Sequence, residues 1–472
     1  MTEKSVSYKI STNIKFSQNI KQLLFKKVLA SDLQNFERNT FNLDPKNKIS
    51  IAPTVLTKFK MPIRKKIVIV LLCGYLLTCY TLKLISLTNY KKKNNLTLIY
   101  SLTKDQVYRK TKLSSLYEFL NSDRFNINKK SEIWVEFKSI KLQRNHKNLH
   151  VVFDIPLNLY SRQFSLYKRT KVLLSIYANV FKFLSFRNKE DYVFLVLKEY
   201  IFDNTVLMHI SSQKIEKVIT TQSNLMFQPL IFEMNIVKKN RFMLWYSSNS
   251  MPLEYKDFKV SRHGIPKEVY QYMKIDQHWV WTKEHSNYLT KAMKVKSCVK
   301  GPMLFYKPST ITLNNQQIDI LLFDVTPSSD HNISKNSIYN VKDAKTFVTE
   351  IIDICARLEN KYGFTLNVSL KPKRKYGNSY DYGYIDFLRA LQSTGRLRIL
   401  KYDENLYDII KLSRIIIGYP FVSPVVIGRN AKLPSFFYCS SKLLKLAPEK
   451  NTGLFIQSSK KLELELKKLL VS

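Results

Sequence analysis

The chain has 472 residues, which is too long for one ordinary hydrophobic core and predicts two or three domains. Hydrophobic residues make up 45% and charged residues 24%, proportions that exclude disorder of the whole chain. The formal net charge of +41 favours polyanionic partners, such as anionic lipid, pyrophosphate-linked substrates or nucleic acid, although an AT-rich genome that overuses Lys would also produce much of it.

Several classes of protein are disfavoured by missing motifs. Nucleic acid is not the favoured partner, because no zinc finger, RNP-like aromatic pattern or basic heptad region accompanies the charge. The sequence has no GxGxxG or P-loop lysine motif, so dehydrogenase and NTPase functions lose support. The five cysteines are widely spaced without zinc-ligand spacing, which indicates buried thiols in a reducing compartment.

The chain begins with a basic extension, residues 1–66, followed by a hydrophobic segment, residues 67–88. The segment is apolar except for Lys83 near its end, and basic residues flank it on both sides. Since about 20 apolar residues span a bilayer, the segment is either a membrane helix or re-entrant hairpin, or a strand and helix buried in the core. The positive charge on both flanks fixes no orientation.

Residues 95–300 predict an irregular α/β domain. Short apolar runs rich in β-branched and aromatic residues predict strands, and one longer amphipathic stretch predicts a helix. The expected strands cover residues 96–100, 151–155, 193–197, 218–222 and 241–247, and the expected helix covers residues 167–183.

Residues 301–472 have the clearest pattern, in which strands alternate with helices. The strongest helical period covers residues 342–360, and Gly363 stands where a helix C-terminal glycine is expected. Such alternation predicts a parallel sheet with right-handed crossovers, that is, a Rossmann-like domain. The expected strands are 318–323, 364–370, 397–400, 414–418 and 435–438, and the other helices are 384–392, 404–412 and 425–431.

Ligands of open parallel sheets bind beyond the carboxyl ends of the strands, so the loops after the predicted strands are the places for a site. The loop after the first strand of this domain contains Asp324, Ser328 and Asp330. These side chains suit contacts with a ribose, a phosphate or an acceptor hydroxyl. The same residues are also common in a turn that caps a helix.

Two further loops suit phosphate binding. After the second strand, Lys371, Lys373, Arg374 and Lys375 place four cations in five residues, which predicts a diphosphate site or else a solvated loop of a Lys-rich chain. After the fourth strand, Ser423 is expected to cap the following helix, whose free N–H groups also hold phosphate.

Residues 417–438, with Pro420-Phe421-Val422-Ser423, resemble the signature of bacterial polysaccharide biosynthesis proteins named for a Pro-Phe-Thr-Ser motif, with Val422 in place of Thr. The tracts 100–103, 220–222, 245–249 and 279–282 are similar to the same family. More distantly, the C-terminal half resembles the donor domain of GT-B glycosyltransferases such as bacterial sialyltransferases. There Lys371-Pro372 would match a His-Pro motif, with Lys replacing His, and Ser423 would match a serine on the donor-phosphate side.

The resemblance implies a GT-B-like fold of two Rossmann-like domains, with an acceptor side over residues 95–300 and a nucleotide-sugar donor side over 301–472. The implied activity is glycosyl transfer to O-antigen or capsule, with a lipid-linked or saccharide acceptor, at the cytoplasmic side of the bacterial inner membrane. The basic surface and residues 67–88 would hold the chain at the anionic inner leaflet. The alternatives are a CDP-polyol phosphotransferase and a basic nucleic-acid-binding protein.

No Asp-x-Asp pair stands in a convincing strand-end loop, so neither a metal ion nor another cofactor is expected. Glycosyl transfer then needs cations and helix N-termini for the leaving nucleotide, and a base for the acceptor hydroxyl. The candidate bases are Asp324, Asp330, His263, His278 and Glu284. We favour Asp324 for its place at a strand end, with His278 second.

Overall fold

The computed structural model describes most of the chain from residue 61 onward. The described residues are 61–85, 95–102, 113–128, 130–137, 145–185, 191–210, 215–221, 228–234, 237, 240–245, 247, 273–303, 318–325, 327, 340–373, 375–376, 381–442 and 455–471. The basic extension, residues 1–66, therefore lies almost entirely outside the described part.

The first sheet has the order β3-β4-β2-β1-β5-β6-β7-β8, and all neighbours are parallel except the β3–β4 pair. Apart from the short β3, the strands follow the order 3-2-1-4-5-6 of a doubly wound Rossmann sheet, with β8 added at the edge. The strands are β1 (Leu96–Leu102), β2 (Glu132–Phe137), β3 (Asn145–His146), β4 (Leu149–Val152), β5 (Ile215–Thr220), β6 (Arg241–Leu244), β7 (Gln277–Val280) and β8 (Ser297–Val299).

The second sheet is parallel throughout and has the order β11-β10-β9-β12-β13-β14, which is again 3-2-1-4-5-6. Its strands are β9 (Ile318–Phe323), β10 (Val368–Lys371), β11 (Arg398–Ile399), β12 (Ser413–Gly418), β13 (Ser435–Tyr438) and β14 (Phe455–Ile456). The prediction of an α/β protein with two parallel sheets is confirmed.

Helices cover both faces of the first sheet, which is why β1 is buried along nearly all of its length. One face packs on α3, α5, α6 and α7, and the other packs on α4. The helices are α3 (Ile63–Ile85), α4 (Leu113–Leu120), α5 (Ile155–Gln163), α6 (Leu166–Ser185), α7 (Asn204–Met208) and α9 (Lys283–Met293).

The strand predicted over residues 193–197 is wrong. These residues lie in the 3₁₀ helix η3 (Asp191–Val196) and in the short helical segment, residues 197–198, that leads into the π-helix η4 (Glu199–Asp203). Val196 and Leu197 are buried, so the run is apolar without the alternation that would distinguish a strand from a helix.

The longest helix of the second domain is α11 (Val341–Tyr362), and its amphipathic pattern is the one that the sequence predicts. The side chain of Asn340 accepts the N–H of Asp343 at 2.7 Å, and Gly363 ends the helix with a φ of 72°. The other helices are α12 (Tyr382–Ser393), α13 (Leu406–Lys411), α14 (Ser423–Asn430) and α15 (Ser459–Val471).

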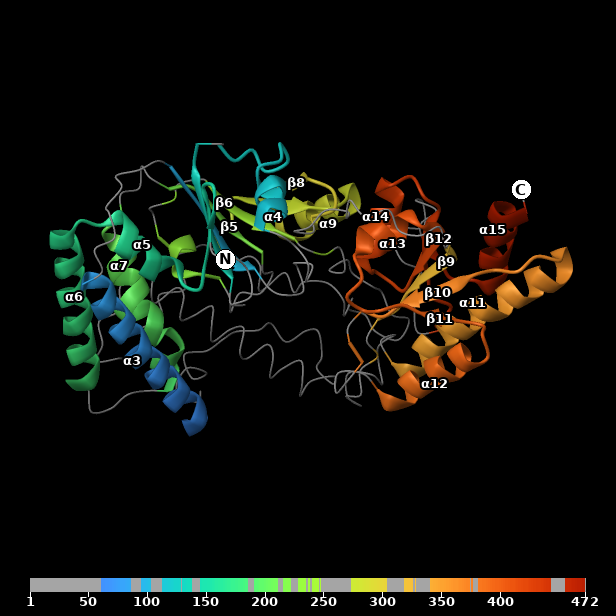
Figure 1. Cartoon of the computed structure of the whole chain (residues 1–472), viewed down its shortest axis with the longest axis horizontal. Helices are drawn as coiled ribbons and strands as arrows, with labels where there is room; N and C mark the ends of the chain where they lie inside the picture. Colours follow the sequence, from blue (N-terminus) through green and yellow to red (C-terminus); the bar gives the residue numbers. More distant parts are fainter. Residues whose placement is uncertain are drawn as a thin grey trace.

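The two domains lie side by side along the long axis of the molecule (Figure 1). Helix α9 of the first domain lies on the side that faces α13 and α14 of the second. Helices α3, α5, α6 and α7 lie at the opposite end of the first domain. The hydrophobic segment predicted over residues 67–88 forms α3, and residues 86–94 are outside the described part of the chain.

Candidate functional site

The carboxyl ends of β10, β9 and β12 meet at one edge of the second sheet. Lys371 pairs with Phe323, and Phe323 pairs with Gly418. The three loops that follow these strands therefore start side by side, and two strand spacings, roughly 10 Å, separate the outer two. The strand order reverses between β9 and β12, which is where doubly wound sheets bind their ligands.

Asp324 follows β9, but its side chain is only 2% exposed. Its Oδ1 accepts the backbone N–H of Lys373 at 3.2 Å, and its Oδ2 accepts the hydroxyl of Tyr384 at 3.2 Å. Burial raises the pKa of Asp324 to about 7, against the opposing effect of these hydrogen bonds and of the Lys373 and Lys371 charges. The carboxylate is therefore enclosed by its neighbours, and its contacts suit holding the β10 loop against α12. Its role as a base stays a prediction.

Lys371 ends β10 with its ammonium group partly buried. The Nζ donates to the carbonyl of Tyr402 at 2.6 Å. Burial lowers the pKa of Lys371 to about 8, and the charges of Asp324, Glu404 and Asp403 oppose this. An ammonium has three donors, so Lys371 can keep this contact and still offer an N–H at the sheet edge.

Of the other residues predicted to bind the donor in these loops, Lys373 has a side chain that the structure describes. The side chain of Lys373 is exposed while its backbone is fixed by Asp324. Arg374, Ser328 and Asp330 lie outside the described residues.

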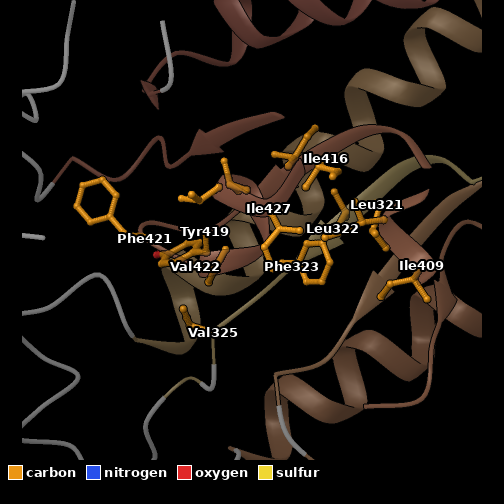
Figure 2. Close-up of a cluster of buried hydrophobic side chains, with 14 of the residues drawn as sticks. Leu321, Leu322, Phe323, Val325, Ile409, Ile416, Tyr419, Phe421, Val422 and Ile427 are labelled. Carbon is orange, nitrogen blue, oxygen red and sulfur yellow. The ribbon is translucent and has the colours of Figure 1, made fainter. Parts of the chain in front are cut away.

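The segment after β12 packs tightly against the strand end (Figure 2). The ring of Phe421 packs edge-on against Phe437, with centroids 5.2 Å apart. A Cβ atom at Gly418 would lie 2.5 Å from a methyl of Val422 and closer still to one of Val425. The Val side chain at the motif's Thr position is thus buried against the strand, and only glycine leaves room for it.

Ser423 does not cap α14, contrary to prediction. The N-cap residue is Val422, which has no side-chain capping bond, and Ser423 is the first helical residue. The Oγ of Ser423 instead donates to the Oγ of Ser247 at 3.1 Å. Ser247 follows β6 in the first domain, so this bond joins the carboxyl ends of strands from the two sheets.

The carboxyl edge of the first sheet contains the other tracts that resemble the polysaccharide biosynthesis family. Thr221, after β5, donates from Oγ1 to the carbonyl of Ser101 at the end of β1, at 2.7 Å. Trp281, after β7, donates from Nε1 to the carbonyl of Trp245, after β6, at 2.6 Å. Thr282 then caps α9. These four tracts, which lie far apart in the sequence, therefore follow one continuous sheet edge.

His278 lies on β7 and is only 1% exposed. Its Nδ1 accepts from Nε1 of Trp245 at 3.1 Å, and burial lowers the pKa of His278 to about 4. Burial, with the His278 charge second, lowers the pKa of His285 on α9 to about 3. Neutral, packed imidazoles suit a structural role better than proton transfer, and the role of His278 as a base stays a prediction.

The remaining candidate bases differ in position. His263 lies outside the described residues. Glu284 is partly exposed on α9, the helix that lies on the side facing α14 of the second domain (Figure 1). Burial lowers the pKa of Arg429 on α14, and the Glu284 charge opposes this. In the described ranges, no group of three or more His, Cys, Asp and Glu side chains could hold a metal ion.

These features define a two-domain α/β protein in which two Rossmann-type sheets approach each other through their carboxyl edges. The family model described as "Polysaccharide biosynthesis PFTS motif protein" matches residues 186–470. The chain belongs to this family, and the predicted resemblance is confirmed.

Solved structures to which the chain is similar include the wall teichoic acid polymerase TagF, with 12% identity over 86% of this chain and 88% of that one and a TM-score of 0.40. An α,α-trehalose-phosphate synthase (UDP-forming) from Burkholderia vietnamiensis has 11% identity over 80% and 89%, with a TM-score of 0.37. A glycosyltransferase from Rickettsia africae has 8% identity over 80% and 89%, with a TM-score of 0.39. A search of curated protein sequences finds no match.

Proposed function

We propose that the chain is a GT-B-type glycosyltransferase that moves a sugar from a nucleotide-activated donor to a growing O-antigen or capsule unit. The observation that carries the proposal is the 3.1 Å hydrogen bond between Ser247 and Ser423. It brings the ligand-binding edges of two Rossmann-type sheets together, so a donor on one edge would face an acceptor on the other. Membership of a polysaccharide biosynthesis family supports a saccharide product.

The donor would bind at the edge of the second sheet. Lys371 and Lys373 would supply cations, as would Arg374, the next residue in the sequence, and the first turn of α14 would supply backbone N–H groups beside Ser423. Together these groups would offset the charge that develops on the departing nucleotide, which is the main demand of the reaction when no metal ion assists.

The acceptor, a saccharide or a lipid-linked saccharide, would bind at the edge of the first sheet. Its hydroxyl needs a base within hydrogen-bonding reach. Of the described candidate bases, Glu284 is the one that is partly exposed, on the helix that lies on the side facing the second domain (Figure 1). Asp324 would serve the donor side indirectly, because it holds the backbone of Lys373.

A thermal-shift screen with CMP, UDP, GDP and CDP tests the proposal, since a nucleotide that binds the folded chain raises its melting temperature. We expect one of them to bind, and Lys371→Met and Ser423→Ala each to weaken it by roughly tenfold or more, as the loss of a hydrogen bond to a charged group does. Methionine keeps the apolar stem of Lys371 in place.

Lys460→Ala, at an exposed lysine of α15, is the matched control and should bind like the parent. Parental binding by both site variants would refute the donor site. If no nucleotide shifts the melting temperature, the transferase proposal fails. Selective binding of CDP with transfer of a polyol phosphate would favour the phosphotransferase alternative.

A further inference from the structure

Large hydrophobic side chains are exposed mainly on two helices of the first domain, α3 and α6, among the residues that the structure describes. Soluble surfaces rarely expose contiguous apolar patches without a partner to cover them. We call this surface the α3–α6 face. Its exposed members are Ile63, Ile67, Val68, Val70, Leu71, Leu72, Tyr75 and Leu82 on α3, and Leu166, Tyr167, Leu174, Phe181 and Leu184 on α6.

The two helices form one surface at one end of the molecule. They pack against each other, and the Oγ1 of Thr81 lies 3.1 Å from the hydroxyl of Tyr177. On α6, Tyr167, Leu174 and Phe181 recur at heptad spacing and therefore lie on one side of the helix. Both helices lie at the end of the first domain that is remote from the second (Figure 1).

Helix α3 is long and apolar enough to cross a bilayer, yet one side of it belongs to the domain core. The most apolar 18-residue window within residues 63–84 has a mean hydropathy of 2.0, and only 17% of that window is buried. The buried part is specific. Tyr80 is fully buried, with its ring 5.4 Å from that of Phe202 and 5.0 Å from that of Tyr160. Leu76 is buried in the same cluster.

A helix that crossed the membrane would withdraw these side chains from the core. Removal of a buried aromatic residue is among the most destabilising changes that a core can undergo. The packing of α3 on the domain therefore disfavours a free membrane-spanning helix, whereas the exposed side of α3 still needs an apolar environment.

The charges of the α3–α6 face indicate which environment it meets. Neither helix contains an acidic residue. Arg64 and Lys65 are exposed at the start of α3, and Lys171 and Lys182 are exposed on α6. Apolar side chains bordered by cations match the acyl boundary and phosphate level of an anionic bilayer, where each cation near the surface adds to the attraction.

We propose that the α3–α6 face is a membrane-docking surface that lies in the plane of an anionic bilayer, with α3 remaining packed on its domain and not crossing the membrane. The inference goes beyond the proposed transferase activity and does not depend on it. It names the partner as an anionic lipid surface and the mode of attachment as interfacial.

Vesicle flotation of the full chain tests the partner. We expect binding to vesicles that contain phosphatidylglycerol and at least about tenfold weaker binding to phosphatidylcholine alone. The double variant Leu71→Ser/Leu174→Ser, at positions 67% and 65% exposed, should bind the anionic vesicles at least about tenfold less. Leu464→Ser on α15, 51% exposed, is the matched control and should bind like the parent.

Tryptophan scanning tests the mode of attachment. Ile67→Trp, Tyr75→Trp and Leu82→Trp are single variants on the exposed side of α3, and the first and last positions are about 22 Å apart along the axis. An in-plane helix places all three at one shallow depth, so brominated lipids should quench them alike. The four native tryptophans are at most 3% exposed and serve as the unquenched background.

Three outcomes would overturn the proposal. The first is a graded series of quenching depths that passes through the bilayer centre, because it would identify a spanning helix. The second is equal binding by the Leu71/Leu174 double variant and the parent, with both folded by circular dichroism. The third is a concentration-dependent dimer that the double variant abolishes while neither protein binds vesicles, because the face would then be an interface between copies of the chain.

Discussion

Replacement of Gly418 by alanine should loosen the packing of α14 on the second sheet. Gly418 ends β12, two residues before Pro420, the first residue of the family motif. An added Cβ would lie 2.5 Å from a methyl of Val422 and closer to one of Val425, where ordinary contacts begin near 3.4 Å. Both valines are buried, so they cannot turn into solvent. The first turn of α14 must therefore move away from the strand, and it carries Ser423 with it.

Overpacking of a well-filled core costs about 1–3 kcal/mol. The free energy of local unfolding of β12 and α14 should fall by that amount. Hydrogen exchange of their backbone amides should then be about 5- to 150-fold faster. If a nucleotide binds at this edge of the sheet, the displacement of Ser423 should also weaken nucleotide binding. A clash with methyl groups also predicts that Gly418→Ala and Val425→Ala together cost less than the sum of the two single changes.

Native-state hydrogen exchange resolved to residues 413–438 is the suitable measurement. Tryptophan fluorescence is not, because all four tryptophans lie in the first domain. Gly74→Ala is the control, since a Cβ there has no neighbour within 4 Å and alanine favours a helix by about 0.5–1 kcal/mol. Parental exchange in Gly418→Ala would refute the close approach of α14 to the strand.

Two pH dependences follow from buried groups. Burial lowers the pKa of His278 to about 4 from its ordinary 6.5, so its neutral form stabilises the fold above 6.5 and this stability, about 3 kcal/mol, is lost as pH falls toward 4. His278→Gln keeps an acceptor for Trp245 and should move acid unfolding, followed by tryptophan fluorescence, to lower pH; an unchanged acid curve would contradict this. Burial raises the pKa of Asp324 to about 7 from 3.8. The protonated carboxyl group therefore contributes its full stabilisation of the fold below pH 3.8, and this contribution is lost as the pH rises through 7. In urea titrations at several pH values, Asp324→Asn should reduce the change in the free energy of unfolding between pH 3.8 and pH 7 by up to about 4 kcal/mol. A pH dependence as steep as that of the parent would refute the raised pKa of Asp324.

Elements with strong periodicity and local end signals could be predicted from the sequence. The strand at residues 318–323 has the predicted bounds, and α11 extends only slightly beyond the predicted 342–360. Asn340 caps the start of that helix and Gly363 caps its end, both through contacts with residues nearby in the sequence. The strand predicted over 364–370 begins only at Val368, because pairing with β9 starts there, and pairing is a property of the neighbouring strand.

The arrangement of the candidate site was predictable only in part. The strand-end rule places Asp324, Lys371 and Ser423 at one sheet edge, and the register brings them there. What the side chains contact was not predictable, because the partners are distant in sequence. The carboxylate of Asp324 is enclosed by Tyr384, and Ser423 meets Ser247 of the other domain instead of capping its own helix.

The α3–α6 face and the candidate site are connected through the first domain. Tyr80 of α3 lies in one buried cluster with Tyr100 at the end of β1, and it interacts with Asp154, which follows β4. The second half of α3 is therefore close to the carboxyl edge of the first sheet, the edge that meets the second domain through Ser247. If the α3–α6 face docks on a bilayer as proposed, a lipid-linked saccharide would approach that edge, and a soluble nucleotide donor would approach the edge of the second sheet. Because the buried Tyr80 holds α3 on its domain, the proposed docking would keep the distance between the membrane and the carboxyl edge of the first sheet constant.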